Sequence, residues 1–305
     1  MRDTAVPALS VVVVSYRRHE ELLLCLADLA AQRATAAFEV VLVLQAYPAG
    51  VPEMIEREFG GRLRLRVFAF EQGLGVHGAR NAALERVSAP IVAFFDDDVR
   101  VPADWVETLL PFYEDLTVGG VGGYVEHPGC TRLSARLLRP ILGMSSRRYR
   151  VDWGGFHTLP FSRHPDRDQT ADWLSGCNMS FRRAALTQVG GFDEAYGNYG
   201  YDDVDMGVRV RAAGWTLVSS KRLAVLHTPS TINRPDFSDL VREEEARRVL
   251  VVRKAIGHLP AWRARYLARL ALHLVATIAQ GISRGRPLLV FSAAAGARRG
   301  LARYA

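Results

Sequence analysis

Residues 1–120 alternate between two kinds of segment, and this alternation restricts the possible folds more than any other feature of the chain. Runs of β-branched and other apolar residues predict strands at 9–14, 38–44, 62–70 and 89–95. Helical patterns lie between these runs, at 18–32, 51–59 and 78–87. Because strands alternating with helices are typical of a parallel sheet covered by helices, we predict an α/β fold of the doubly wound class.

Beyond residue 120 the pattern changes. A glycine-rich strand at 118–127 is followed by a loop-rich stretch at 128–170, which contains His157 and His164. A strand that runs into a helix, a second helix and a final strand are predicted at 171–186, 202–214 and 215–227. We therefore expect one domain over 1–235 and a separate helical, basic region over 236–305.

The charge of the chain is unevenly distributed. Residues 246–305 contain twelve Arg and Lys and no Asp or Glu, so their net charge is +12. Because the net charge of the whole chain is +7, residues 1–245 carry a net charge of −5. A basic tail on a mildly acidic body suggests an anionic partner such as a membrane surface. The alternative is a solvated, Arg-rich helical face. No nucleic-acid-binding motif accompanies the charge, so we expect no nucleic-acid partner.

The tail also carries an apolar stripe. Its longest uncharged run, Leu270–Ser283, is shorter than the roughly 20 residues that span a bilayer. Apolar residues recur every four positions, at Trp262, Tyr266, Leu270, Leu274 and Ile278. This stripe either lies in a membrane interface or packs on the body or on a second copy of the chain, which would make a homo-oligomer.

The cysteines bear on the compartment. Cys25, Cys130 and Cys177 are odd in number and form no CxxC pair, which favours a reducing compartment. The apolar run near the N-terminus is too short for a signal peptide. We predict a cytoplasmic protein, with peripheral attachment to the inner face of the plasma membrane as one option for the tail.

Three consecutive carboxylates follow the fourth predicted strand, at Asp96, Asp97 and Asp98. In α/β sheets, ligands bind beyond the carboxyl ends of the strands. Side chains two apart in an extended segment point the same way, so Asp96 and Asp98 can face one ligand. Hard divalent cations prefer carboxylate oxygens, so the run predicts a site for Mn²⁺ or Mg²⁺. An ordinary acidic turn is the alternative.

Two further constellations carry chemistry. The stretch 71–81 places glycines at the start of a helix, where free backbone amides favour anions. The stretch 201–205 opens a helix with three acids, which is more than capping requires, so one of them could deprotonate a hydroxyl. His227, at the end of the last strand, is either a further ligand or a structural residue.

In their order along the chain, these motifs resemble glycosyltransferase family 2. The resemblance covers about residues 8–230 and rests on "VVVVSYRR", "GVHGARNAAL", "FFDDDV", "GCNMSFRRAALTQVGGFDEAY" and "YDDVDMGVRVRAAGW". It implies the GT-A nucleotide-sugar-binding fold, a mostly parallel twisted sheet flanked by helices. Within 1–235, residues 1–120 would form the nucleotide-binding half and 121–235 the acceptor-binding half. The chain is most similar to inverting, non-processive bacterial members.

The resemblance also implies roles for individual residues. The metal and the donor diphosphate would be held by Asp96, Asp98 and His227. Arg80 would contact the nucleotide base, and Ser15, Tyr16 and Arg17 would line the same pocket. Other donor contacts would come from Gln45, Gly75 and Asp97. Asp203 would be the general base, with Asp202 as its partner. Acceptor contacts would come from Trp173, Asn178 and Asp205.

Two positions depart from the family pattern. Gln45 stands where an acidic residue usually binds the nucleotide base. Because an amide can both donate and accept hydrogen bonds, the sequence does not identify which base the donor carries. Asp202 replaces the usual Glu before the base and is one methylene shorter.

The resemblance predicts transfer of one sugar from a nucleoside-diphosphate sugar to a hydroxyl of a glycan, lipid-linked or small-molecule acceptor, with Mn²⁺ or Mg²⁺. Three alternative functions are considered against the sequence. Nucleotidyl transfer would require a Lys-bearing glycine loop after the first strand, and a processive synthase would carry a QxxRW-like motif and membrane spans; the sequence has none of these. A non-catalytic scaffold that acts through the basic tail is the remaining alternative.

Overall fold

The computed structural model describes residues 6–126, 149–157, 167–197, 200–228, 236–283, 286 and 288–304. One central sheet runs through the body, in the order β3-β2-β1-β4-β8-β6-β9-β5, and β7 pairs with β9. Its strands are β1 (Leu9–Tyr16), β2 (Phe38–Gln45), β3 (Leu65–Phe70), β4 (Ile91–Asp96), β5 (Val99–Arg100), β6 (Val118–Glu126), β7 (Gln169–Ala171), β8 (Met179–Arg182) and β9 (Thr216–His227).

The first four strands are parallel, as the sequence predicts. β1 pairs with β2 and β4, and β2 pairs with β3. The next strand in the sheet, β8, is antiparallel to both β4 and β6, while β6 and β9 are parallel. Because β8 pairs with β4 on one side and β6 on the other, the strands before and after residue 120 form one continuous sheet.

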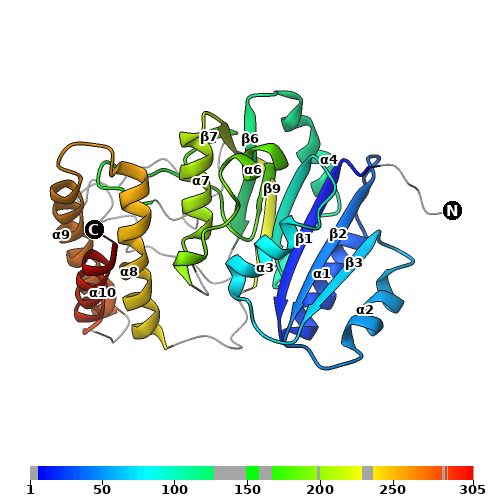
Figure 1. Cartoon of the computed structure of the whole chain (residues 1–305), viewed down its shortest axis with the longest axis horizontal. Coiled ribbons are helices and arrows are strands. Elements are labelled where there is room, and N and C mark those ends of the chain that lie inside the picture. Colours follow the sequence, from blue (N-terminus) through cyan, green and yellow to red (C-terminus); the bar gives the residue numbers. More distant parts are fainter. Residues whose placement is uncertain are drawn as a thin grey trace.

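Helices cover both faces of the sheet (Figure 1). Alternate residues of β1 point to opposite faces: Val11 and Val13 pack in one core cluster, and Val12 and Val14 in the other. The first cluster includes side chains of α1 (His19–Ala30), α2 (Val51–Phe59), α4 (Trp105–Leu109) and the 3₁₀ helix η1 (Leu110–Glu114). The second includes those of α3 (Gly75–Leu84), α6 (Arg183–Gln188), η2 (Glu194–Tyr196) and α7 (Asp202–Ala212).

Three further helices form the end of the molecule opposite α2 and β3 (Figure 1). They are α8 (Phe237–Ile256), α9 (Trp262–Ser283) and α10 (Leu289–Tyr304). α10 lies very close to α8: a Cβ added at Gly296 or Gly300 would overlap the carbonyl oxygen of Arg242 or Ala246. This close approach explains why glycines are placed inside a helix. The predicted fold, including its helical basic extension, is confirmed.

The predicted apolar stripe of the tail faces inward at four of its five positions, and the fifth, Ile278, is 41% exposed. Tyr266 and Leu270 are buried with Phe156, Val249 and Val252, and Trp262 and Leu274 pack against this cluster. Buried polar contacts add to it: the Glu245 carboxylate accepts hydrogen bonds from Arg248 at 2.8 Å and pairs with His273 Nε2 of α9 at 2.9 Å. Burial opposes the charged form of Glu245, but these two partners lower its pKa well below the usual range. Of the two options for the stripe, packing on the body is the one observed for these residues.

Among the residues that the structure describes, no helix has both the length and the apolar character that crossing a bilayer requires.

Candidate active site

The carboxyl ends of three strands meet at one edge of the sheet. β1 ends at Tyr16 and its neighbour β4 ends at Asp96, with Val14 paired to Asp96. The chain turns after β4 and forms β5, which pairs antiparallel to β9 with Val99 opposite His227. This pairing carries the end of β9 back to the acidic turn. The sheet therefore assembles residues from the beginning, middle and end of the body.

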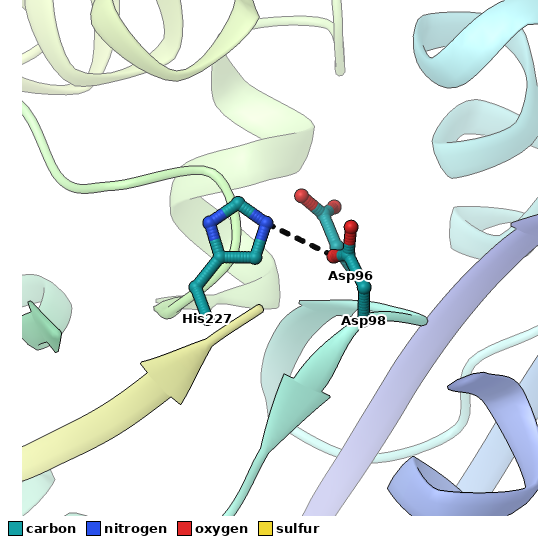
Figure 2. A group of neighbouring side chains, drawn as sticks. All are labelled: Asp96, Asp98 and His227. Atoms are coloured by element: carbon teal, nitrogen blue, oxygen red, sulfur yellow. Dashed lines mark ion pairs between the residues drawn. The ribbon is translucent and has the colours of Figure 1, made fainter. Parts of the chain in front are cut away.

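Asp96, Asp98 and His227 form a group that could hold a metal ion. One ligand atom from each lies within 4.8 Å of the others. Figure 2 shows the imidazole pointing at the two carboxylates, with His227 Nε2 at 3.0 Å from Asp98 Oδ1. The side chain of Asp96 is 32% exposed, so the group can be reached from outside. Two carboxylates with one imidazole suit a divalent cation, and its charge would offset the repulsion between the acids.

Asp97 differs from its two neighbours because its carboxylate binds residues at and just after the end of β1. It accepts a hydrogen bond from Ser15 Oγ at 2.5 Å and one from Arg18 Nη1 at 3.0 Å. Arg18 Nη1 also lies 3.2 Å from Asp98 Oδ2. Burial raises the pKa of Asp97 to about 7, although Arg18 acts against this rise. The predicted donor residues Ser15 and Asp97 are therefore buried parts of the framework around the metal group.

Arg80 connects the acidic turn to the start of α7. Its side chain is 2% exposed, and its guanidinium pairs with Asp202 and, at 2.9 Å, with Asp96 Oδ1. A third hydrogen bond goes to the carbonyl oxygen of Gly176 at 2.9 Å. The resemblance assigned Arg80 to the nucleotide base, but the structure encloses its guanidinium between two carboxylates and a backbone carbonyl.

The two acids at the start of α7 lie in different environments. Asp202 is buried, with Arg80 on one oxygen and His77 Nε2 at 3.6 Å from the other. Burial opposes the charged form of Asp202, but Arg80 outweighs burial and lowers its pKa to about 2. Asp203 is half-buried, and its carboxylate accepts hydrogen bonds from the backbone amides of Gly176 at 3.0 Å and Val204 at 2.8 Å. Burial, followed by the charge of Asp202, raises the pKa of Asp203 to about 7.

A proton acceptor at neutral pH therefore fits Asp203 and not Asp202. Asp202 is kept charged by Arg80, whereas Asp203 has a side chain that is partly open and a pKa near the working range of a general base. Gly176 lies between Asp203 and Arg80: its amide donates to the first, and its carbonyl accepts from the second. Asp203 is thus linked through Gly176 and Arg80 to Asp96.

The buried ion pair of Arg80 leads to a stability prediction. We expect Arg80→Gln to lower the free energy of unfolding by about 3–5 kcal/mol, because it leaves the buried Asp202 carboxylate without its main partner. The measurement is a urea unfolding curve. The control, Arg100→Gln, removes an exposed pair with Asp28 and should cost less than about 1 kcal/mol. Equal costs for the two variants would contradict the central position given to Arg80.

The remaining predicted donor residues surround the loop before α3. Tyr16 is 38% exposed, and its ring lies against Gly73 with the Arg17 guanidinium 5.5 Å from the ring centroid. Gln45 is buried, and its side-chain oxygen accepts a hydrogen bond from the Leu74 amide at 2.8 Å. Gly75 starts α3 with a φ of 70°, which favours glycine. The contact of Tyr16 with the nucleotide stays a prediction, and its partly exposed ring lies beside this loop.

The three predicted acceptor residues lie in the core instead. Trp173 packs edge-on against the rings of Tyr149 and His157. The Asn178 side chain donates to the Leu223 carbonyl at 2.7 Å and accepts from Trp105 at 3.2 Å. Asp205 is fully buried and pairs with Tyr196, Arg209 and Lys254. All three side chains are buried in this structure, and their role in binding the acceptor stays a prediction.

Some residues around the site were absent from the sequence-based set. Arg18, Tyr47, His77 and Gly176 all contact a predicted site residue. Three of them lie inside quoted motifs, Arg18 in "VVVVSYRR", His77 in "GVHGARNAAL" and Gly176 in "GCNMSFRRAALTQVGGFDEAY", so the motifs were the available signal. The expected acceptor segments at 128–148 and 158–166, with His164, lie outside the described residues. His157 is described, and it packs between Trp173 and Tyr201.

Comparison with solved structures identifies the fold class. A mannosyltransferase from Pyrobaculum calidifontis, in complex with GDP-Man and Mn²⁺, matches with a TM-score of 0.63 and 20% identity, over 98% of this chain and 88% of that chain. S. aureus TarS 1-349 in complex with UDP-GlcNAc matches with a TM-score of 0.56 and 17% identity, over 96% and 89% of the two chains. The protein has the fold of the GT-A glycosyltransferases.

The sequence comparisons identify the family. The model of glycosyl transferase family 2 matches residues 10–190, and that of the N-terminal domain of galactosyltransferase matches residues 157–237. The chain belongs to glycosyl transferase family 2. A validoxylamine A glucosyltransferase of Streptomyces hygroscopicus is 29% identical over 240 residues, covering 73% of this chain and 52% of that protein.

A further relative matches a shorter stretch. An N-acetylglucosaminyl-diphospho-decaprenol L-rhamnosyltransferase of Mycobacterium tuberculosis is 34% identical over 125 residues, covering 40% of each chain. The matches to these two relatives thus span about half of the relatives' own length or less.

Proposed function

We propose that this protein is a metal-dependent, inverting glycosyltransferase that moves one sugar from a nucleoside-diphosphate sugar to a hydroxyl group of an acceptor. The observation that carries the proposal is the arrangement of Asp96, Asp98 and His227 at one sheet edge, linked through Arg80 and Gly176 to Asp203. Membership of family 2 supports transferase activity. Glycan, lipid-linked and small-molecule acceptors all remain within the proposal.

In the proposed reaction the two acidic sites have separate tasks. Asp96, Asp98 and His227 would hold Mn²⁺ or Mg²⁺. A bound cation would supply positive charge that offsets the charge of the departing nucleoside diphosphate. Asp203 takes the proton of the acceptor hydroxyl, whose oxygen forms a bond to the sugar carbon as the bond to the diphosphate breaks. A single displacement of this kind inverts the configuration at that carbon. Arg80 keeps Asp202 charged and holds it beside Asp203, the general base.

The alternative is a non-catalytic scaffold that keeps the fold for binding. The site favours a catalytic function over a scaffold, because Asp96, Asp98 and His227 offer ligand atoms within 4.8 Å of one another and are linked through Arg80 and Gly176 to a candidate base. A scaffold would gain nothing from keeping the pKa of Asp203 near neutral.

Thermal unfolding against UDP, GDP, dTDP and CDP, each with and without Mn²⁺, tests the proposal. A ligand at a hundredfold excess over its Kd stabilises the folded state by about 2.7 kcal/mol. We expect one nucleotide to raise the melting temperature in the presence of Mn²⁺ and to have little effect without it. The absence of a shift with every nucleotide would favour the scaffold.

The pH dependence of the reaction follows from Asp203. A general base acts in its unprotonated form, so we expect kcat/KM to rise about tenfold per pH unit below about 7 and to level off above it. The measurement is the initial rate of nucleoside-diphosphate release between about pH 5.5 and 8.5. A profile that is flat across this range would show that Asp203 is not the group that accepts the proton.

A further inference from the structure

Helix α9 is apolar on both of its faces. The inner face, with Tyr266 and Leu270, belongs to the core between α8, α9 and α10. The outer face carries five large apolar side chains with exposed fractions between 36% and 66%, namely Leu267, Leu272, Val275, Ile278 and Ile282. A helix that only packed on the body would carry polar residues there, so the outer face requires a separate explanation.

Exposed apolar residues of α9 lie along one side of the helix. Ala264, Ala268, Ala271, Val275, Ile278 and Ile282 recur at alternating steps of four and three, which keeps them on one side of the helix. From 264 to 282 this side is about 27 Å long. At the start of α10, Leu288 and Phe291 are 69% and 68% exposed. Of the thirteen exposed large apolar side chains in the described residues, seven lie in this region, so the distribution is not a random scatter.

The surroundings of this surface are basic. Arg263 and Arg265 are exposed near the start of α9, whereas the exposed Arg298 and Arg303 of α10 line grooves beside Glu243 of α8. The nearest acids of α8 already have cationic partners: Asp239 pairs with Arg242, and Glu243 with Arg299. Residues 246–305 contain no Asp or Glu, and six of their twelve Arg and Lys residues pair with acids outside this segment, which leaves Arg265 among those with no carboxylate partner in the described ion pairs.

We propose that the outer face of α9, together with the start of α10, binds the surface of an anionic lipid bilayer. The helix would lie in the plane of the interface, with Val275, Ile278 and Ile282 among the acyl chains and the arginines beside the headgroups. A second copy of the chain fits less well, because a two-fold contact would bring two acid-free, arginine-rich segments together. This binding is independent of the reaction proposed above and uses the outer face of α9, which includes Ile278 of the predicted stripe but not Tyr266 or Leu270.

Vesicle co-sedimentation tests the proposal with the full chain. Vesicles of phosphatidylcholine alone are compared with vesicles that contain phosphatidylglycerol, at low and high salt. We expect wild type to bind the anionic vesicles and to lose binding as salt rises. Val275→Glu/Ile278→Glu should weaken the partition coefficient about tenfold or more, because it puts two charges where apolar side chains are buried.

The matched control places the same two charges elsewhere. Leu24→Glu/Leu116→Glu changes two exposed leucines of the body and should bind the vesicles as wild type does. Val275→Ser/Ile278→Ser gives a milder version if the charged variant does not fold, as judged by circular dichroism. The proposal is overturned if wild type does not bind anionic vesicles, or if the outer-face variants bind as tightly as the control. Concentration-dependent dimers that the outer-face variants abolish, without vesicle binding, would assign the surface to a second copy.

Discussion

Replacing Asp203 by Asn should lower the turnover rate by about 10²–10⁴-fold, the range that a positioned general base contributes. Asn has nearly the same shape, and its side-chain oxygen can still accept the hydrogen bond from the Gly176 amide, but it cannot take a proton. The measurement is the rate of nucleoside-diphosphate release. When no acceptor is supplied, this rate reports hydrolysis of the donor, in which water takes the place of the acceptor hydroxyl. The rise of kcat/KM through pH 7 should disappear in the same variant.

The control for this result is donor binding. Asp203 makes no direct contact with Asp96, Asp98 or His227 among the described interactions, so the Mn²⁺-dependent thermal shift with the nucleotide should stay close to that of wild type. Asp104→Asn, which changes an exposed aspartate, should leave both rate and binding unchanged. If Asp203→Asn retained more than a tenth of the wild-type rate, another group would have to accept the proton.

The second large effect is expected at Asp98. Asp98→Ala removes one of two carboxylates from the metal group, together with its contacts to His227 and Arg18. Since a bound metal contributes several kcal/mol to such a reaction, we expect the rate to fall by at least about 100-fold, or about 3 kcal/mol. The thermal shift produced by nucleotide with Mn²⁺ should be lost as well.

Direct titration with Mn²⁺ separates this effect from a general loss of structure. Binding can be followed by the paramagnetic resonance signal of the free ion, with Asp104→Ala as a control variant of unchanged affinity. Unaltered Mn²⁺ affinity in a folded Asp98→Ala protein would remove Asp98 from the metal group and would require a different ligand set.

The sequence predicted the parts of the fold that depend on local pattern. The strands β1 to β4 and the helices between them follow from apolar periodicity, and the edge that gathers Asp96 and Asp98 follows from strand direction alone. His227 was harder to place, because its position depends on the pairing of β5 with β9. The resemblance to family 2 supplied what periodicity could not, namely which acid to expect as the base.

The burial of polar residues could not be predicted in this way. Asp205 looked like a site residue because it follows Asp202 and Asp203, but its partner Lys254 is 49 positions away on a helix whose docking has no local signal. The Arg80–Asp202 pair joins residues 122 positions apart. Arg80, which was predicted to contact the nucleotide base, instead pairs with a carboxylate inside the protein. Such contacts depend on tertiary packing, which propensity and motif spacing do not encode.

The antiparallel strand β8 has a consequence for how this protein can change its specificity. It lies between β4 and β6, so backbone hydrogen bonding between strands is continuous from the strands before residue 120 to those after it. A chimera that exchanged the two halves between relatives would have to rebuild this ladder as well as the Arg80 link. New acceptor preferences are therefore expected to arise by replacement of surface loops rather than by shuffling of whole halves, and libraries for directed evolution should be confined to such loops.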